Sequence, residues 1–265
     1  MTLQAMWRSF LRAALTAGAV AIGCAGPVLA APPLGIQGAD DRTAVEVDAY
    51  PWSSVGRLNN AGRGFCTAVL IAPDKVLTAA HCLRSHVAGR AWASPSTVHF
   101  LAGYRRGAYL AHSPAAAIAL ASAAAGTTPT GADFAIVTLA RPLNAIVQPL
   151  PVESFDHERW RADRRAGVRY SQAGYSGDRA HVLTQNQSCS ITGFVQKGTA
   201  LAHTCDATHG DSGSPILVRR GQAYAVVGLH IASSRSGGNG VAIAGRTLRA
   251  GLDRLADIRP KPYRR

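Results

Sequence analysis

Short runs of apolar, β-branched and aromatic residues, each bounded by Gly, Pro, Asp or Asn, recur along most of the chain. This pattern of short apolar runs bounded by turn residues predicts β-strands rather than helices. The runs form two groups on either side of 142–165, a proline-containing and then charged stretch that we interpret as a linker. We therefore expect an all-β protein built from two small barrels. The runs are 65–71, 75–78, 97–101, 134–139, 169–175, 181–184, 188–195, 215–218, 223–231 and 240–244.

Helical periodicity is clear only near the C-terminus. Leu248, Leu252 and Leu255 recur at i, i+4 and i+7 and predict a helix over 247–258, stopped by a proline. A second segment, 114–125, is rich in alanine and has helix propensity. Because it lies between predicted strands, its structure stays open.

The N-terminal residues 1–30 have the pattern of an export signal. Arg8 and Arg12 precede a small apolar run at 13–26, and residues 28–30 supply a small-residue cleavage site. The run is shorter than the roughly 20 apolar residues that a membrane-spanning helix needs. We therefore expect a secreted or periplasmic, monomeric protein without stable membrane insertion after signal removal.

Removal of the signal leaves four cysteines, an even number that predicts two disulfides in an exported chain. Three pairings are possible. We favour Cys66 with Cys82 and Cys189 with Cys205, because each closes a loop of 16 residues, worth about 3 kcal/mol in the chain-entropy model. A zinc site would call for C-x-x-C spacing, so no metal is expected. Lipidation of Cys24 is the alternative within the signal, although the leucine usual three residues before an acylated cysteine is missing.

The formal net charge of +13 raises the question of a polyanionic partner. The basic residues are mostly arginines scattered along the chain, and their local clusters lack interleaved aromatic residues. We interpret them as a solvated basic surface and expect no nucleic-acid partner. The alternative, a surface binder, predicts salt-dependent retention on polyanions.

Ser212 stands in the string Gly-Asp-Ser-Gly-Ser-Pro, directly before an apolar strand. Acyl transfer by a serine needs a base, a carboxylate that orients the base, and donors for the developing oxyanion. Glycines on both sides of Ser212 permit a tight turn that exposes the hydroxyl. We assign Ser212 as a candidate nucleophile and the amides of Gly210 and Ser212 as a candidate oxyanion hole.

The candidate base is His81, which ends a predicted strand. Its neighbour Cys82 is expected to form a disulfide, which would fix the backbone that carries the histidine. The candidate orienting carboxylate is Asp133, which opens an apolar strand and therefore needs a partner. Taken alone, each residue also has an ordinary structural interpretation. His81 could be a core or exposed histidine, and Asp133 could be an exposed aspartate that caps a strand.

Three sequences, CTAVLIAPDKVLTAAHC, DFAIVTLARPL and GDSGSPI, occur in the order His, Asp, Ser. In order and spacing they resemble the motifs of the chymotrypsin/trypsin-like serine endopeptidases. The resemblance implies two six-stranded antiparallel β-barrels with a C-terminal helix, and a cofactor-free enzyme that cleaves protein or peptide substrates through an acyl-enzyme. It implies a His81–Asp133–Ser212 triad and these domains: a pro-segment or N-terminal arm at 31–48, a first barrel at 49–150, a second barrel with the helix at 151–258, and a basic tail at 259–265.

Within that family, HTCDATHGDSGSP and VVGLHIAS resemble the bacterial glutamyl-endopeptidase-like branch. This implies that His230 helps to bind a substrate glutamate. The chain departs from the branch at Ala207, where those enzymes carry a hydroxyl residue. Asp206 has the offset of the acidic residue that gives trypsin its Arg/Lys preference. Glu-type and Arg/Lys-type specificity both remain open.

The resemblance also suggests a zymogen. Asp211 matches the residue that pairs with the new α-amino group in trypsin-like enzymes, and 36–38 (Ile-Gln-Gly) is a candidate new N-terminus. The competing class is a binding protein that has kept the scaffold without the activity.

Overall fold

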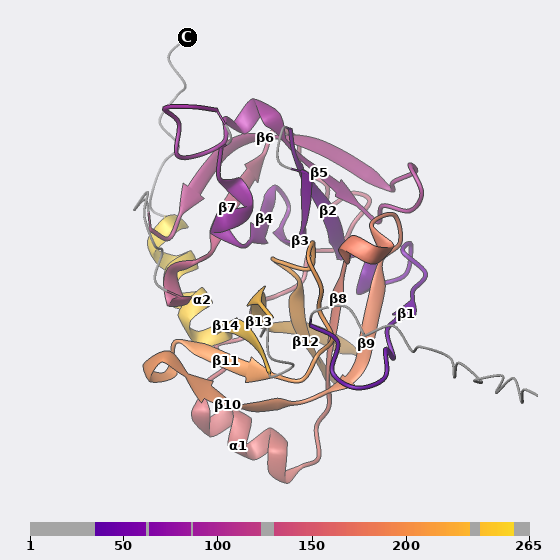
Figure 1. The fold of residues 1–265 in the computed structure, drawn as a ribbon, viewed down its shortest axis with the longest axis vertical. Helices are drawn as coiled ribbons and strands as arrows, with labels where there is room; N and C mark the ends of the chain where they lie inside the picture. The colour runs from indigo at the N-terminus through magenta and orange to yellow at the C-terminus, as the bar shows by residue number, and fades with distance from the viewer. Residues whose placement is uncertain (1–34, 62–63, 86, 123–129, 234–238, 257–265) are drawn as a thin grey trace, which may run out of the picture. The chain divides into compact units, whose positions relative to one another are not determined.

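The computed structural model describes residues 35–61, 64–85, 87–122, 130–233 and 239–256 (Figure 1). The signal, Cys24 and the basic tail lie outside these residues. No helix of the described part is long and apolar enough to cross a membrane. The elements are β1 (Thr43–Ala44), β2 (Val55–Asn60), β3 (Gly64–Ala72), β4 (Lys75–Thr78), β5 (Val98–Ala102), β6 (Ala111–Leu120), β7 (Ala135–Leu139), α1 (His157–Arg165), β8 (Tyr170–Gly174), β9 (Thr184–Cys189), β10 (Ile191–Val195), β11 (Ala200–His203), β12 (Pro215–Arg220), β13 (Ala223–Ala232), β14 (Gly240–Ala244) and α2 (Gly245–Ala256).

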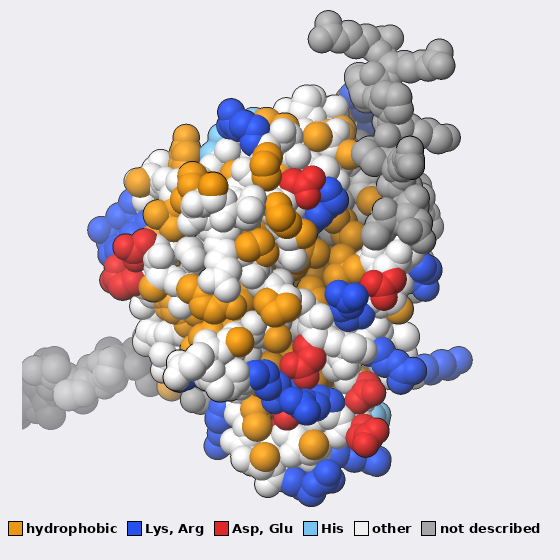
Figure 2. All heavy atoms as spheres, turned by 180° about the vertical axis from the view of Figure 1, so that it is seen from behind, with side chains coloured by type: hydrophobic (Ala, Val, Ile, Leu, Met, Phe, Trp, Pro, Cys, Tyr) orange, Lys and Arg blue, Asp and Glu red, His pale blue; other side chains and the backbone are white. Residues whose placement is uncertain are grey.

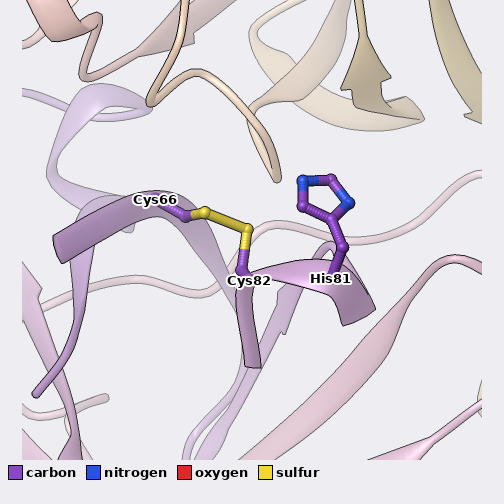
Figure 3. Close-up of side chains that lie close together, drawn as sticks. All are labelled: Cys66, His81 and Cys82. Atoms are coloured by element: carbon purple, nitrogen blue, oxygen red, sulfur yellow. A yellow bond between two sulfur atoms is a disulfide. The ribbon is translucent and has the colours of Figure 1, made fainter. Parts of the chain in front are cut away.

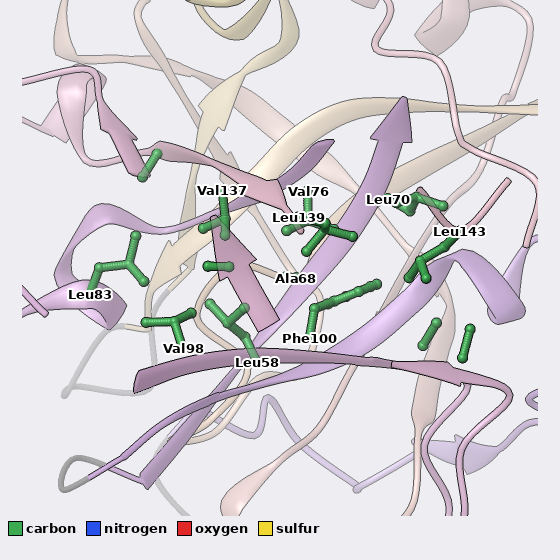
Figure 4. Close-up of a cluster of buried hydrophobic side chains, with 14 of the residues drawn as sticks. Leu58, Ala68, Leu70, Val76, Leu83, Val98, Phe100, Val137, Leu139 and Leu143 are labelled. Atoms are coloured by element: carbon green, nitrogen blue, oxygen red, sulfur yellow. The ribbon is translucent and has the colours of Figure 1, made fainter. Parts of the chain in front are cut away.

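The first half is a closed antiparallel barrel with the strand order β2-β3-β4-β7-β6-β5. Side chains alternate between its interior and its outer face, as the two-residue period of a strand requires. Leu58, Val76, Phe100 and Val137 fill the interior and are buried (Figure 4). Gly56 lies against Phe100, and a Cβ there would overlap the ring, so the phenylalanine fits only beside a glycine.

Residues 114–120 of the alanine-rich segment belong to a strand, β6, and the end of the segment lies outside the described residues. The strand pairs with β5 on one side and β7 on the other. The two ladders close the barrel and outweigh the weak local helix preference of alanine.

The second half is an eight-stranded antiparallel sheet with the order β1-β9-β8-β12-β13-β14-β11-β10. Only Ser190 separates β9 from β10, although these strands lie near opposite ends of the order. The sheet therefore curls until its two ends meet at this bend. With β9 and β10 counted as one bent strand, it has the six strands expected of a barrel, and β1 adds a short strand at the edge. The expected fold class is confirmed.

A shared core joins the two halves. Leu77 and Phe134 of the first half pack with Leu217, Leu229 and Leu248 of the second. The last belongs to α2, which forms where the leucine spacing predicts a helix.

The predicted linker contains a helix that the sequence pattern does not reveal. The carboxylate of Asp156 accepts from the Arg159 backbone N–H and caps the start of α1. Trp160 anchors the helix, since it is buried and its indole N–H donates to the Ile191 carbonyl over 3.0 Å. One apolar anchor in a charged segment is too little periodicity to predict a helix.

Candidate active site

His81 lies in a short 3-10 helix directly after β4, and Asp133 lies just before the neighbouring strand β7. Asp133 Oδ2 is 2.7 Å from His81 Nδ1, and the His81 backbone N–H donates to Asp133 Oδ1 over 2.9 Å. A carboxylate only accepts, so Nδ1 carries the proton and Nε2 of the neutral ring remains an acceptor. The His81 side chain is 31% exposed against 15% for Asp133, so the ring is accessible to a substrate and the carboxylate is shielded behind it.

The predicted disulfide between Cys66 and Cys82 forms beside His81 (Figure 3). It ties β3 to the 3-10 helix and so fixes the backbone that carries the histidine. The two sulfurs and the His81 ring lie close together. Because the sulfurs are bonded to each other, neither is a thiolate, and the group is not a metal site. The second predicted disulfide, Cys189–Cys205, also forms.

Ser212 occupies a turn between two glycines with positive φ, Gly210 at +97° and Gly213 at +87°. At Gly213 a Cβ would overlap the Thr67 carbonyl and the Thr78 hydroxyl, so only glycine fits. The Thr67 N–H donates to the Ser212 carbonyl over 3.0 Å and anchors the turn to the first barrel. Within the described part of the chain, the N–H groups of Gly210 and Ser212 donate to no other protein group.

One cavity of about 210 Å³ brings His81 and Ser212 together. Its walls come from both halves of the chain, and the Gly210 backbone lies beside the two side chains. The lining residues are Asn60, Gly64, Phe65, Cys66, His81, Cys82, His209, Gly210 and Ser212.

In the full-length chain, the Asp211 carboxylate is hydrogen-bonded to neighbouring hydroxyl and amide groups. The zymogen hypothesis concerns a new α-amino group that only cleavage would create, so it stays a prediction. The Asp211 Oδ2 accepts from the Ser176 hydroxyl and from the Thr208 N–H, both over 2.7 Å. Burial raises the pKa of this carboxyl to about 6. The Ile36 side chain is buried elsewhere, and the next residue, Gln37, donates its N–H to Asp206 over 2.7 Å. Asp211 is therefore satisfied by hydroxyl and amide donors.

His230 lies on β13, close to the turn that carries Ser212. The Gly213 N–H donates to the His230 carbonyl, and the His230 N–H donates to the Ser214 carbonyl, over 2.7 and 2.8 Å. A second buried histidine, His203, places its Nε2 3.0 Å from His230 Nδ1. The Cys205 N–H donates to His203 Nδ1, so the Nε2 proton of His203 points at His230 and His230 carries its own proton on Nε2. Burial lowers the pKa of both rings, that of His203 to about 3, so both are neutral at pH 7.

Asp206 and Ala207 are buried and both contact the N-terminal arm. Besides the bond from Gln37 to Asp206, the Ala207 N–H donates to the Gly35 carbonyl over 3.1 Å. Burial raises the pKa of Asp206. One oxygen of this carboxylate is thus occupied by the arm, which weakens its suitability as a receptor for a substrate lysine or arginine.

The architecture is the chymotrypsin-like fold. A solved structure described as a Glu endopeptidase in complex with MPD matches it with a TM-score of 0.67 and 21% sequence identity, covering 83% of this chain and 98% of the other. Residues 41–248 match the family described as Trypsin. The chain belongs to this family, and it is accordingly a serine endopeptidase, a hydrolase.

Two parts of the site were missed by sequence reasoning. His203 supports His230, and Arg42 fastens the arm to the segment at 176–179. Neither residue stands in a motif, and each meets its partner only after strands distant in sequence have paired.

Proposed function

We propose that this protein is an exported endopeptidase in which Ser212, His81 and Asp133 form the catalytic triad. The contact of His81 with Asp133, in one cavity with Ser212, carries this proposal. The His81 Nε2 accepts the Ser212 proton as Oγ attacks the scissile carbonyl carbon. Asp133 holds the tautomer and stabilises the imidazolium.

The oxyanion of the tetrahedral intermediate accepts from the N–H groups of Gly210 and Ser212. Their lack of other acceptors within the described residues supports this role. Collapse of the intermediate breaks the peptide C–N bond, and His81 gives the proton to the leaving amine. The acyl group remains as an ester on Ser212 until water, deprotonated by His81, attacks it in the same way and releases the acid.

For specificity we favour cleavage after acidic residues. His230 offers an Nε2 proton that His203 keeps in place from behind, and a substrate carboxylate is the complementary acceptor. Asp206 argues less well for Arg/Lys cleavage because the arm occupies one of its oxygens. Ala207 supplies no hydroxyl, so recognition of the carboxylate depends more heavily on His230.

Export into the periplasm or the medium is part of the proposal. The signal-like residues 1–30 and the two disulfides support it, since disulfides persist in oxidising compartments. The substrates would be proteins or peptides. On the face in Figure 2, Lys and Arg side chains occur at several separate places, commonly near acidic ones. That the protein is a monomer without a nucleic-acid partner is part of the proposal.

Labelling with a serine-directed phosphonate tests the triad. We expect modification of Ser212, detected by mass spectrometry of the tryptic peptide, together with cleavage of casein, and neither in Ser212→Ala. An unlabelled Ser212 and no cleavage by the purified mature chain would instead support the inactive-scaffold class.

A peptide library in which the residue directly before the scissile bond is varied over all amino acids tests the substrate specificity. We expect glutamate to be favoured, and His230→Ala to raise KM for glutamyl peptides more than for alanyl peptides. Asp206→Asn is the matched control. A preference for arginine that Asp206→Asn removes would reverse the assignment.

A further inference from the structure

The N-terminal arm, residues 35–46, is built into the second half of the molecule. Its strand β1 pairs with β9, and the Asn186 amide donates to Asp41. The arm carries Arg42, which is only 5% exposed. A guanidinium is rarely buried unless it is paired, so its partners show what the arm holds.

Arg42 forms a two-pronged ion pair with Asp178, a residue of the loop after β8. The distances are 3.0 Å from Nη1 to Oδ1 and 2.6 Å from Nη2 to Oδ2. Asp40 holds the guanidinium on its other edge through Nε and Nη2, and Arg179 donates to the Arg42 carbonyl over 2.7 Å. Two parallel bonds fix orientation as well as distance, so the 176–179 loop has a set position relative to the arm.

Asp178 passes this restraint to the segment before the nucleophile. The Thr208 hydroxyl donates to Asp178 Oδ1 over 3.0 Å, and the Thr208 N–H donates to Asp211 Oδ2 over 2.7 Å. The same loop supplies Ser176 to Asp211, and the Gly177 N–H donates to the His209 carbonyl. Segment 206–211 is thus held along its length from one side.

The two N–H groups assigned to the oxyanion hole belong to Gly210 and Ser212, the residues directly before and after Asp211. A rotation of Asp211 would therefore move both amides. Within the described residues, no ammonium or guanidinium group is hydrogen-bonded to the Asp211 carboxylate. Its orientation depends on Ser176 and Thr208, and theirs on the loop that Arg42 clamps.

We propose that Arg42 is a positioning residue for catalysis, which through Asp178 and Thr208 sets the oxyanion amides of Gly210 and Ser212. In this proposal the arm positions Asp211, a role that the zymogen hypothesis assigns to a new α-amino group. This inference rests on the proposed triad mechanism. It differs from a purely stabilising role for Arg42 because it requires loss of turnover in protein that is still folded.

Four substitutions test it in the full chain: Arg42→Ala, Arg42→Lys, Asp178→Asn and Thr208→Val. Thr208→Val is nearly isosteric, deletes the hydroxyl bond to Asp178 and keeps the N–H bond to Asp211. The matched control is Arg105→Ala, which removes another ion pair of the arm, with Glu46, at an exposed position. The readouts are kcat and KM on one peptide substrate, the rate of Ser212 phosphonylation, and the melting temperature.

We expect kcat to fall about 10- to 100-fold in all four variants, as for misplaced catalytic groups, with KM nearly unchanged and phosphonylation slowed in parallel. Millimolar guanidinium should restore kcat in Arg42→Ala and not in Thr208→Val. Arg105→Ala should keep wild-type kcat.

Wild-type kcat in the folded variants would overturn the inference, as would an equal loss in Arg105→Ala. If Arg42→Ala does not fold, Thr208→Val decides, because it leaves the Arg42 ion pairs intact. Failure of the wild-type protein to react with the phosphonate would refute the triad itself, which is a separate outcome.

Discussion

The carboxylate of Asp133 has two tasks at once, because it accepts from both the backbone and the ring of His81. In Asp133→Asn the amide can donate to Nδ1, which favours the tautomer whose Nε2 carries the proton and can no longer take one from Ser212. We expect kcat to fall about 1,000- to 10,000-fold with little change in KM. Steady-state kinetics measure this. Asp74→Asn, which breaks an exposed pair with Lys75, is the control and should have no effect; comparable kinetics for the two variants would refute the role of Asp133.

Asp211 is expected to cost stability. Its folded pKa, raised by burial to about 6 from the ordinary 3.8, means that the folded state holds the proton more tightly than the unfolded chain. The free energy of unfolding therefore falls as pH rises between these values and stays lower above them, by about 3 kcal/mol. Arg42 and Asp178 are the charged groups acting on this carboxyl, and the first only partly offsets the burial.

Asp211→Asn keeps an acceptor for Ser176 and Thr208 and removes the charge. Relative to the parent, we expect this variant to gain stability as pH rises through that window, and to gain nothing more above it. Urea unfolding at stepped pH measures the difference, in a Ser212→Ala background that prevents self-digestion. Asp253→Asn, at an exposed site on α2, is the control. A stability difference that is independent of pH would contradict the raised pKa.

Which residues could be predicted depended on how far apart their partners lie in the sequence. His81, Asp133 and Ser212 stand in strings with a fixed order, so the resemblance marked them as candidates before any contact was known. Arg42 meets Asp178 across 136 positions and His203 meets His230 across 27. No local pattern marks such pairs, since each depends on the register of strands that pair only in the folded chain.

At the scale of elements, the strand pattern was informative because alternation and turn residues are local signals. Most predicted runs became strands with ends shifted by a residue or two. The pattern missed β1, β2 and β11, and the run predicted at 181–184 lies almost entirely before β9. β6 and α1 differ from their local sequence pattern for opposite reasons. β6 has helix propensity but forms a strand because it pairs with β5 and β7. α1 lacks helical periodicity and is stabilised mainly by its N-terminal cap and by the buried Trp160.

The two disulfides offer a comparison at this scale, because each closes a loop of 16 residues. Replacing either pair by serines should lower the free energy of unfolding by about 3 kcal/mol. Only the Cys66/Cys82 pair adjoins His81, so only its loss should also lower kcat in the folded protein. Urea unfolding and steady-state kinetics on both double variants measure this. Equal losses of kcat would show that the first disulfide has no special role in holding the histidine.

At the scale of the whole molecule, we predict that the contacts of residues 35–46 limit where an active mature chain can begin. The sequence left 31–48 open as a pro-segment or an arm, and residues from Gly35 to β1 contact the second half of the molecule. From these contacts we predict an arm that the mature enzyme retains. A mature protein that lacked these residues would lose Arg42 and the bond to Asp206 together. Processing that leaves an active enzyme should therefore cut before Gly35.

Two shortened chains test this, one beginning at Gly35 and one at Val45. We expect the first to match the full chain in kcat after signal removal. The second should fall about 10- to 100-fold, like the Arg42 variants, because its oxyanion amides are no longer held from the arm. A synthetic peptide of residues 35–46 should restore activity to the chain that begins at Val45, while the same peptide with Arg42→Ala should not. Full activity of that chain without the peptide would show that the arm is a dispensable pro-segment, since the groups that orient Ser212 would then suffice without it.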